Sequence, residues 1–229
     1  MRGVPAILWR LHGHCMLRRS VWERALPAMK LGHILQIFLA TATLLAPAAQ
    51  AFDLKDLSTQ LSKPAVIRGP FIQEKHLRAL PQPLVSQGSF VLAKDYGLLW
   101  LLKTPLQQDY RISARGIARR DATGWQMLPG KSAGAQQNHL FFAVLQGDSS
   151  ELARDFELDL KGDAGAWTLQ LTPRSLLLKQ VFTRIDISGG DYVQRIELAE
   201  TQGDSTVLRM PASTSATSLS DAERADLAE

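Results

Sequence analysis

The stretch Gly97-Leu98-Leu99-Trp100-Leu101-Leu102-Lys103 decides the fold. On a strand, alternate side chains point to opposite faces of the sheet, so both faces of this segment are apolar. An open antiparallel sheet normally leaves one face in water. The segment therefore favours a curved sheet that is packed by a helix on one side and encloses an apolar cavity, or a second layer, on the other. The central strand of an ordinary sandwich core is an equally good interpretation of these residues alone.

Several neighbouring segments have the alternating pattern of strands. Residues 86–94 precede the quoted stretch, and residues 108–114 follow it. Later, alternating runs at 181–187 and 192–198 are joined by Gly189-Gly190, which is typical of a hairpin. Successive short strands predict an antiparallel sheet that curls into a barrel or a sandwich. Two further alternating runs belong to this series, namely 156–160 and 167–171.

Helical patterns are fewer, so the predicted class is mainly β with some helices (α+β). Residues 52–61 place leucines at helical spacing, which predicts a short amphipathic helix. Residues 138–145 (NHLFFAVL) begin with a good helix cap and are almost wholly apolar, and Ser149 or Ser150 starts another turn. A helix that is apolar on most sides must be buried or must cover an apolar surface. We therefore expect a helical insert at about 130–155 that lies over the sheet.

The N-terminal segment Met29–Ala51 has the layout of a secretory signal peptide. Lys30 supplies a positive charge, residues 34–46 form an apolar run, and Ala49-Gln50-Ala51 has the small-x-small form that signal peptidase cuts after. The run is shorter than the roughly 20 apolar residues that span a bilayer, so a retained membrane anchor is the less favoured interpretation. We expect cleavage before Phe52.

The leader also changes the organisation and the charge of the chain. We expect translation to start at Met29, a leader over 1–51, one domain over 52–211 and a mobile polar tail over 212–229, where large apolar side chains are scarce. Of the 26 basic and 22 acidic residues, 20 and 21 remain after cleavage, which gives no support for a nucleic-acid partner. The only cysteine, Cys15, lies in the leader, so a disulfide framework and a thiolate nucleophile are excluded.

Motifs that carry catalysis or metal binding are missing beyond residue 51. Two histidines remain, His76 and His139, and neither belongs to a zinc motif. No Gly-x-Ser-x-Gly nucleophile turn occurs. The acidic residues Asp155, Glu157 and Asp159 alternate with apolar residues, as on the solvent-facing side of a strand. A catalytic pair of carboxylates among them remains an alternative, because the sequence does not give the distances between them. We therefore expect no catalytic residues, no metal and no cofactor, and a protein that is not an enzyme.

Several short motifs, in order, resemble those of the periplasmic outer-membrane lipoprotein carrier family (LolA-like) of Gram-negative bacteria. The resemblance covers most of the chain after the leader. It rests on the short helix after the cleavage site and on Phe71-Ile-Gln73-Glu-Lys75, Ser86-Gln-Gly88-Ser-Phe90, Gly97-Leu98-Leu99-Trp100 with Pro105, Trp167-Thr-Leu-Gln-Leu-Thr172-Pro173 and Leu178-Lys-Gln180.

The resemblance implies a curved, incomplete antiparallel β-barrel with a helical lid over an apolar cavity. In this family the cavity holds the acyl chains of lipoproteins on their way from the inner to the outer membrane. It implies a soluble monomer of the periplasm, an acylated lipoprotein or other lipid as cargo, an inner-membrane release transporter and an outer-membrane receptor. The residues expected to form the cavity and lid are Phe90, Leu92, Trp100, Tyr110, Trp125, Leu140, Phe141, Phe142, Val144 and Leu145.

One position departs from the family pattern. Where the family carries an Arg-Pro pair whose arginine holds the lid closed, this chain has Lys94-Asp95. A lysine is a point charge without the forked donors of arginine, so Lys94 is a candidate lid contact of a different kind. This difference favours, as alternatives, a carrier or sensor of another amphiphile, such as a glycolipid or a lipid-linked product. An enzyme that uses the same cavity is a third interpretation, because a fold does not dictate a function.

Overall fold

The computed structural model describes residues 51–129, 144, 145, 147 and 149–228. Several sequence predictions therefore lie outside the described residues. These are the leader up to residue 50 with its start at Met29 and the cleavage residue Ala49, and the lid candidates Leu140, Phe141 and Phe142, together with His139.

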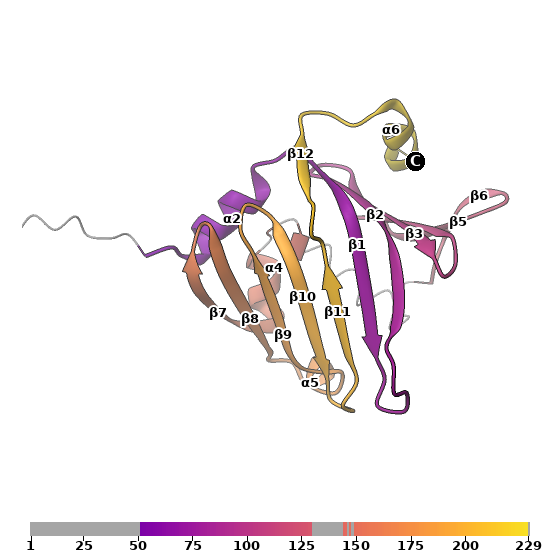
Figure 1. Ribbon diagram of the computed structural model, residues 1–229. Coiled ribbons are helices and arrows are strands. Elements are labelled where there is room, and N and C mark those ends of the chain that lie inside the picture. The colour runs from indigo at the N-terminus through magenta and orange to yellow at the C-terminus, as the bar shows by residue number, and fades with distance from the viewer. Residues whose placement is uncertain (1–50, 130–143, 146, 148, 229) are drawn as a thin grey trace, which may run out of the picture. The chain divides into compact units, whose positions relative to one another are not determined.

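Twelve antiparallel strands form one curved sheet that does not close on itself (Figure 1). Its order is β6-β5-β4-β3-β2-β1-β11-β10-β9-β8-β7, and β12 pairs with the start of β1. The predicted incomplete antiparallel barrel is confirmed, and the sandwich interpretation is wrong because all the strands belong to one sheet. The strands are β1 Val66–His76, β2 Leu84–Ala93, β3 Gly97–Thr104, β4 Gln108–Ser113, β5 Gly116–Asp121, β6 Gly124–Met127, β7 Phe156–Asp163, β8 Ala166–Pro173, β9 Phe182–Gly189, β10 Val193–Glu200, β11 Ser205–Arg209 and β12 Thr214–Ala216.

Strand β3 separates two apolar layers, as its sequence predicts. Leu98 and Trp100 belong to the large core cluster on the inner face of the sheet. Leu99 belongs to a smaller cluster on the outer face, with Leu101 packed against it. Because side chains alternate along a strand, these two sets must point in opposite directions. The first four residues of β3 are buried, and α6 packs against the strand on the outer face.

An aromatic stack at the centre of the inner face explains several of the sequence motifs. The rings of Phe71 (β1) and Trp100 (β3) are stacked with their centroids 3.8 Å apart, and Phe90 (β2) lies 6.4 Å from Trp100. Gly88 makes room for this stack, since a Cβ atom there would lie 2.7 Å from the Phe71 ring. Residues far apart in the chain thus meet because β1, β2 and β3 are neighbours.

Helices α2 (Leu54–Ser62) and α4 (Ser149–Asp155) cover the inner face. Asp53 caps α2 by accepting hydrogen bonds from the backbone of Lys55 and Asp56, and the Asp56 carboxylate accepts one from the backbone N–H of Asp53 in return. Leu57 and Leu61, four residues apart on one side of α2, are buried. A short helix, α5 (Leu176–Lys179), closes the end of the sheet between β8 and β9.

The C-terminal residues differ from the mobile polar tail that the sequence predicts. Strand β12 pairs with β1, and helix α6 (Asp221–Ala228) lies against β3 on the outer face (Figure 1). Leu219 and Leu227 are buried there. The prediction is wrong because it weighed only the scarcity of apolar residues, whereas ion pairs to the sheet also hold this segment.

Two ion pairs and one hydrogen bond join α6 to side chains of the sheet. Arg68 of β1 forms a two-point ion pair with Glu223, with its Nε 2.6 Å from Oε1 and its Nη2 2.5 Å from Oε2. Arg120 of β5 lies 2.5 Å from the carboxylate of Asp226. The buried Arg111 of β4 donates from Nη1 to the backbone oxygen of Asp226 at 3.0 Å. The helix is therefore fixed at both of its ends.

Candidate functional site

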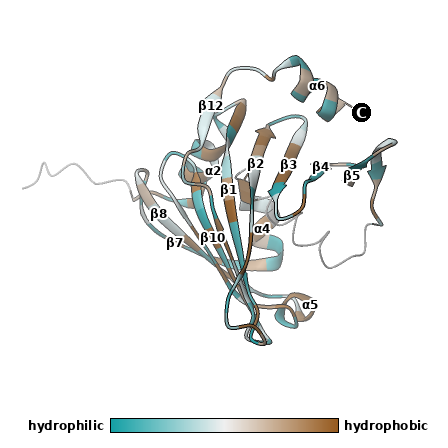
Figure 2. Ribbon diagram, turned by 45° about the vertical axis from the view of Figure 1, so that its right-hand side comes forward, coloured by the Kyte–Doolittle hydropathy of each residue, from teal (hydrophilic) through white to brown (hydrophobic). Residues whose placement is uncertain are grey.

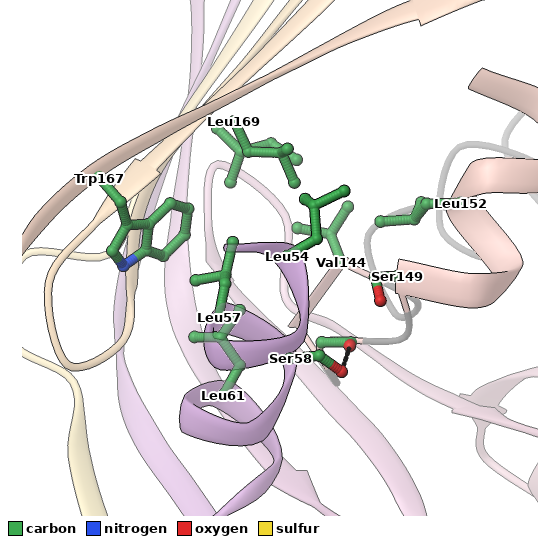
Figure 3. Close-up of a pocket in the computed structure, with 11 residues that line it drawn as sticks. Leu54, Leu57, Ser58, Leu61, Val144, Ser149, Leu152, Trp167 and Leu169 are labelled. Atoms are coloured by element: carbon green, nitrogen blue, oxygen red, sulfur yellow. Dashed lines mark hydrogen bonds between the residues drawn. The ribbon is translucent and has the colours of Figure 1, made fainter. Parts of the chain in front are cut away.

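An apolar pocket lies on the inner face between α2, α4 and strands β8 and β9 (Figure 3). The helices supply leucines, and the strands supply Trp167, Leu169 and Ile187. Among the described residues of the wall, the polar side-chain groups are two serine hydroxyls and the indole N–H of Trp167. The described lining residues are Leu54, Leu57, Ser58, Leu61, Val144, Gly147, Ser149, Leu152, Trp167, Leu169 and Ile187.

The pocket is narrow in this structure. Its open volume is about 20 Å³, which is close to the space of one water molecule. Pockets that hold small ligands have volumes of roughly 300 to 1,000 Å³. The described side chains of α2, α4, β8 and β9 thus leave too little open space for an acyl chain in this structure.

Few polar contacts hold α2 against its neighbours. The Ser58 hydroxyl donates to the backbone oxygen of Gly147 at 2.6 Å (Figure 3). Gly147 has φ +72°, and a Cβ atom there would lie 2.8 Å from Leu61 Cβ, so only glycine permits this close approach. On the opposite side, Gln60 Nε2 donates to the backbone oxygens of Gly190 at 2.7 Å and Ala164 at 3.0 Å.

A polar mouth adjoins the apolar pocket. It shares Ser58, Leu61 and Gly147 with the apolar pocket and has an open volume of about 300 Å³. Lys94 and Asp95, from the turn between β2 and β3, form one side of the mouth. The backbone N–H of Lys94 donates to the oxygen of Ala65 at 3.1 Å, which ties this turn to the chain just before β1. A charged group thus lies beside the entrance to the apolar pocket.

Among the described residues, the structure places all but one of the other predicted site residues on the inner face of the sheet. Phe90, Leu92, Trp100, Val144 and Leu145 are buried in the inner core, and Tyr110 packs against it. Of these, only Val144 lines the apolar pocket, while Leu92 lines the polar mouth.

Trp125 is the exception, because it lies on the outer face. Its ring packs against the smaller cluster and lies between two guanidinium groups, 5.0 Å from that of Arg111 and 4.5 Å from that of Arg120. The prediction that Trp125 lines the cavity is therefore wrong. Strand β6 has only four residues, so the sequence gives too short a pattern to fix which side each residue faces.

Most residues of the pocket wall are not among those predicted from the sequence. The leucines of α2 and the β8 and β9 residues Trp167, Leu169 and Ile187 line the pocket. Their periodicity in the sequence marks them as core-facing. Only the pairing of β8 with β9, and the position of α2 over both, brings them to one place.

Most of the chain matches a protein-family model. The model described as "Outer membrane lipoprotein carrier protein LolA-like" matches residues 46–228. The chain belongs to this LolA-like family. No curated protein sequence matches the chain significantly.

Solved structures similar to the LolA-like chain are distant. They include MucB (14% identity over 76% of this chain and 62% of that one, TM-score 0.48) and the MucA/MucB complex of Pseudomonas aeruginosa (15%, 74% and 58%, TM-score 0.45). A LolA superfamily protein from Nitrosomonas europaea has 9% identity over 74% of this chain and 94% of that one, with a TM-score of 0.44. The chain spans about three fifths of the MucB chains.

Two features are absent from the described residues. None of the helices in the described ranges has both the length and the apolar character needed to cross a membrane. Within the same ranges, no three His, Cys, Asp or Glu residues come together as metal ligands.

Proposed function

We propose that this LolA-like protein is a binding protein of the periplasm that shields the acyl chains of lipoproteins between the inner and the outer membrane. The observation that carries the proposal is the pocket under α2, whose described wall is apolar except for two serine hydroxyls and one indole N–H. Such a wall favours hydrocarbon over any polar ligand. The proposal includes removal of the leader before Phe52, an inner-membrane donor and an outer-membrane acceptor.

The narrowness of the pocket suits a carrier. Burial of an acyl chain contributes about 0.8 kcal/mol per methylene, so a sixteen-carbon chain that is fully enclosed would gain roughly 12 kcal/mol, near nanomolar affinity. Release from such a site would be slow. Here part of that free energy offsets the cost of separating α2 from the sheet, which lowers the net affinity and permits handover.

The second candidate function is transport or sensing of another amphiphile, such as a glycolipid or a lipid-linked product. The polar mouth favours it, because Lys94 lies where the headgroup of a lipid in the apolar pocket would emerge. An enzyme that uses the cavity is the least supported proposal. Among the described residues of the pocket wall, only Ser58, Ser149 and Trp167 carry polar side-chain groups, and the indole N–H of Trp167 donates to the backbone oxygen of Gly190 at 2.7 Å.

Extraction of bound lipid tests these proposals. Protein purified from the periplasm of a Gram-negative host is extracted with organic solvent, and the extract and any co-purified protein are analysed by mass spectrometry. Recovery of acylated lipoprotein supports the first function, and recovery of a free glycolipid or lipid-linked product supports the second. Protein that yields no lipid in either fraction overturns both.

A pair of adjacent serines provides the matched control. Ser149 lines the pocket and its neighbour Ser150, which is exposed, does not. Ser149→Trp should place an indole in the narrow space and reduce the bound lipid at least tenfold. Ser150→Trp should leave the amount within twofold of the wild type. Equal lipid content in the two variants would show that the cargo binds elsewhere.

A further inference from the structure

Exposed large hydrophobic side chains gather at one end of the sheet. Nine such side chains occur among the described residues. Two of them lie elsewhere: Tyr96 is in the turn after β2, close to Lys94, and Met127 is the last residue of β6. The other seven lie at the opposite ends of the strands, where β1, β3, β8 and β10 stop and β2, β9 and β11 begin. They are Leu80, Leu84, Val85, Leu106, Leu176, Leu177 and Val181.

Helix α5 projects from the sheet at this end of the strands (Figure 2). Leu178 packs against the inner core, whereas Leu176 and Leu177 are 81% and 61% exposed. Ser175 caps the helix by accepting from the backbone of Leu178 at 3.2 Å, so the two leucines are held outward by a defined turn. A folded domain rarely presents neighbouring leucines to water without a surface for them to contact.

Hydrogen bonds connect α5 to the neighbouring loops. Thr201, in the turn between β10 and β11, donates from its backbone to Val181 at 3.0 Å and from its hydroxyl to Gln180 at 2.7 Å. In the same turn, the carboxylate of Asp204 accepts from the backbone of Arg78 at 2.8 Å. The segments 77–85, 174–181 and 201–204 therefore form one continuous surface, which we call the α5 rim.

The α5 rim is basic as well as apolar. Its three segments hold Arg78, Arg174 and Lys179, all exposed, against a single acid, Asp204. Arg154 and Asp155, next to the rim at the start of β7, add one charge of each sign. Exposed leucines flanked by cations are the combination that binds an anionic lipid surface, since apolar insertion and attraction to the headgroups add.

We propose that the α5 rim docks the protein on an anionic phospholipid bilayer. This inference goes beyond the proposed function and rests on it only in that a lipid carrier must meet a membrane. Leu176 and Leu177 enter the headgroup region, and Arg174 and Lys179 face the lipid phosphates. Strand β1 extends for 11 residues between the polar mouth and the rim, so the mouth is held about 30 Å from the bilayer and stays open to an incoming ligand.

Flotation with protein-free vesicles tests the docking. The protein purified from the periplasm is mixed with vesicles of phosphatidylglycerol and phosphatidylethanolamine, or of phosphatidylcholine alone. We expect at least tenfold more bound protein on the anionic vesicles, and a decrease with added salt. Leu176→Asp with Leu177→Asp should reduce the bound fraction at least tenfold. The control, Tyr96→Asp with Met127→Asp, makes the same charge change at exposed sites away from the rim and should stay within twofold of the wild type.

The outcomes that overturn the docking are distinct from failure of the carrier function. Equal flotation of the two double variants would overturn it, as would wild-type protein that binds neither kind of vesicle, or binds only membranes that contain proteins. An apolar fluorescent probe reports on the pocket in the same samples. The rim variant should still bind the probe, and Ser149→Trp should lose the probe while still floating with anionic vesicles. Thermal unfolding of each variant checks that the fold is intact.

Discussion

At the scale of single residues, Gly88 shows how a short motif determines the packing of three strands. The Phe71 ring lies directly over it and stacks on Trp100. A Cβ atom at position 88 would also lie 2.1 Å from the backbone oxygen of Leu101 on the paired strand. The glycine is thus required by its neighbours and not by an unusual backbone conformation of its own.

Substitution of this glycine should therefore be costly. We expect Gly88→Ala to lower the free energy of unfolding by about 2 to 3 kcal/mol, since both the aromatic stack and the β2–β3 pairing must shift. Urea denaturation of the purified protein measures this. The control is Gly165→Ala, where the new Cβ would have only the Asp163 carboxylate within 4 Å, at 3.5 Å, and the change should stay within about 0.5 kcal/mol. Equal values for the two variants would contradict the packing argument.

At the scale of elements, α6 is held by ion pairs as well as by buried leucines. Hydrogen bonds from Arg68, assisted by the backbone and hydroxyl of Ser220, lower the pKa of Glu223 from 4.5 to about 2. A carboxyl group whose pKa is lower in the folded state stabilises that state above its unfolded pKa. The contribution is lost as the pH falls through the folded pKa. We therefore expect α6 to loosen between about pH 4.5 and pH 2.

Hydrogen exchange of the α6 amides over this pH range measures the loosening. Glu223→Gln should lower the free energy of opening α6 by about 1 kcal/mol at pH 7. This value is small because both side chains of the ion pair are partly exposed. In this variant, exchange of the α6 amides should depend less on acid pH than in the wild type. Glu197→Gln, which removes the exposed pair with Arg195, should leave α6 unchanged. An acid response that persists in Glu223→Gln would show that another group controls the helix.

The same elements show what the sequence can predict. Strands β8, β9 and β10 and helix α2 follow from periodicity, because each of them buries one regular face. Strand β3 follows instead from its continuous apolar run, because it buries both faces. Helix α6 does not, since its anchors Arg68 and Arg120 lie more than 100 residues earlier and become partners only when the sheet forms. The pocket is predictable in part. Periodicity in the sequence marks its side chains as core-facing, but their assembly under α2 depends on the order of the strands.

At the scale of the whole molecule, the proposed function requires a movement, because the pocket among the described residues is too small for an acyl chain. We expect α2 to move away from the sheet when a chain binds, so that the described structure corresponds to the closed state. If a chain binds only an open state, the apparent affinity falls in proportion to the population of that state. Anything that weakens the closed contacts should therefore strengthen binding without touching the ligand.

Two side chains allow this coupling to be tested. Ser58 and Gln60 hold α2 at opposite sides through backbone oxygens of Gly147, Gly190 and Ala164. Removing both with alanine should cost the closed state about 1 to 2 kcal/mol, and so raise the open population roughly five- to thirtyfold. We expect a similar gain in affinity for an apolar fluorescent probe and faster hydrogen exchange in α2. Thr59→Ala serves as the control, because that hydroxyl donates only within the helix, to Lys55. Unchanged or weaker probe binding in the double variant would mean that the ligand enters without displacing α2.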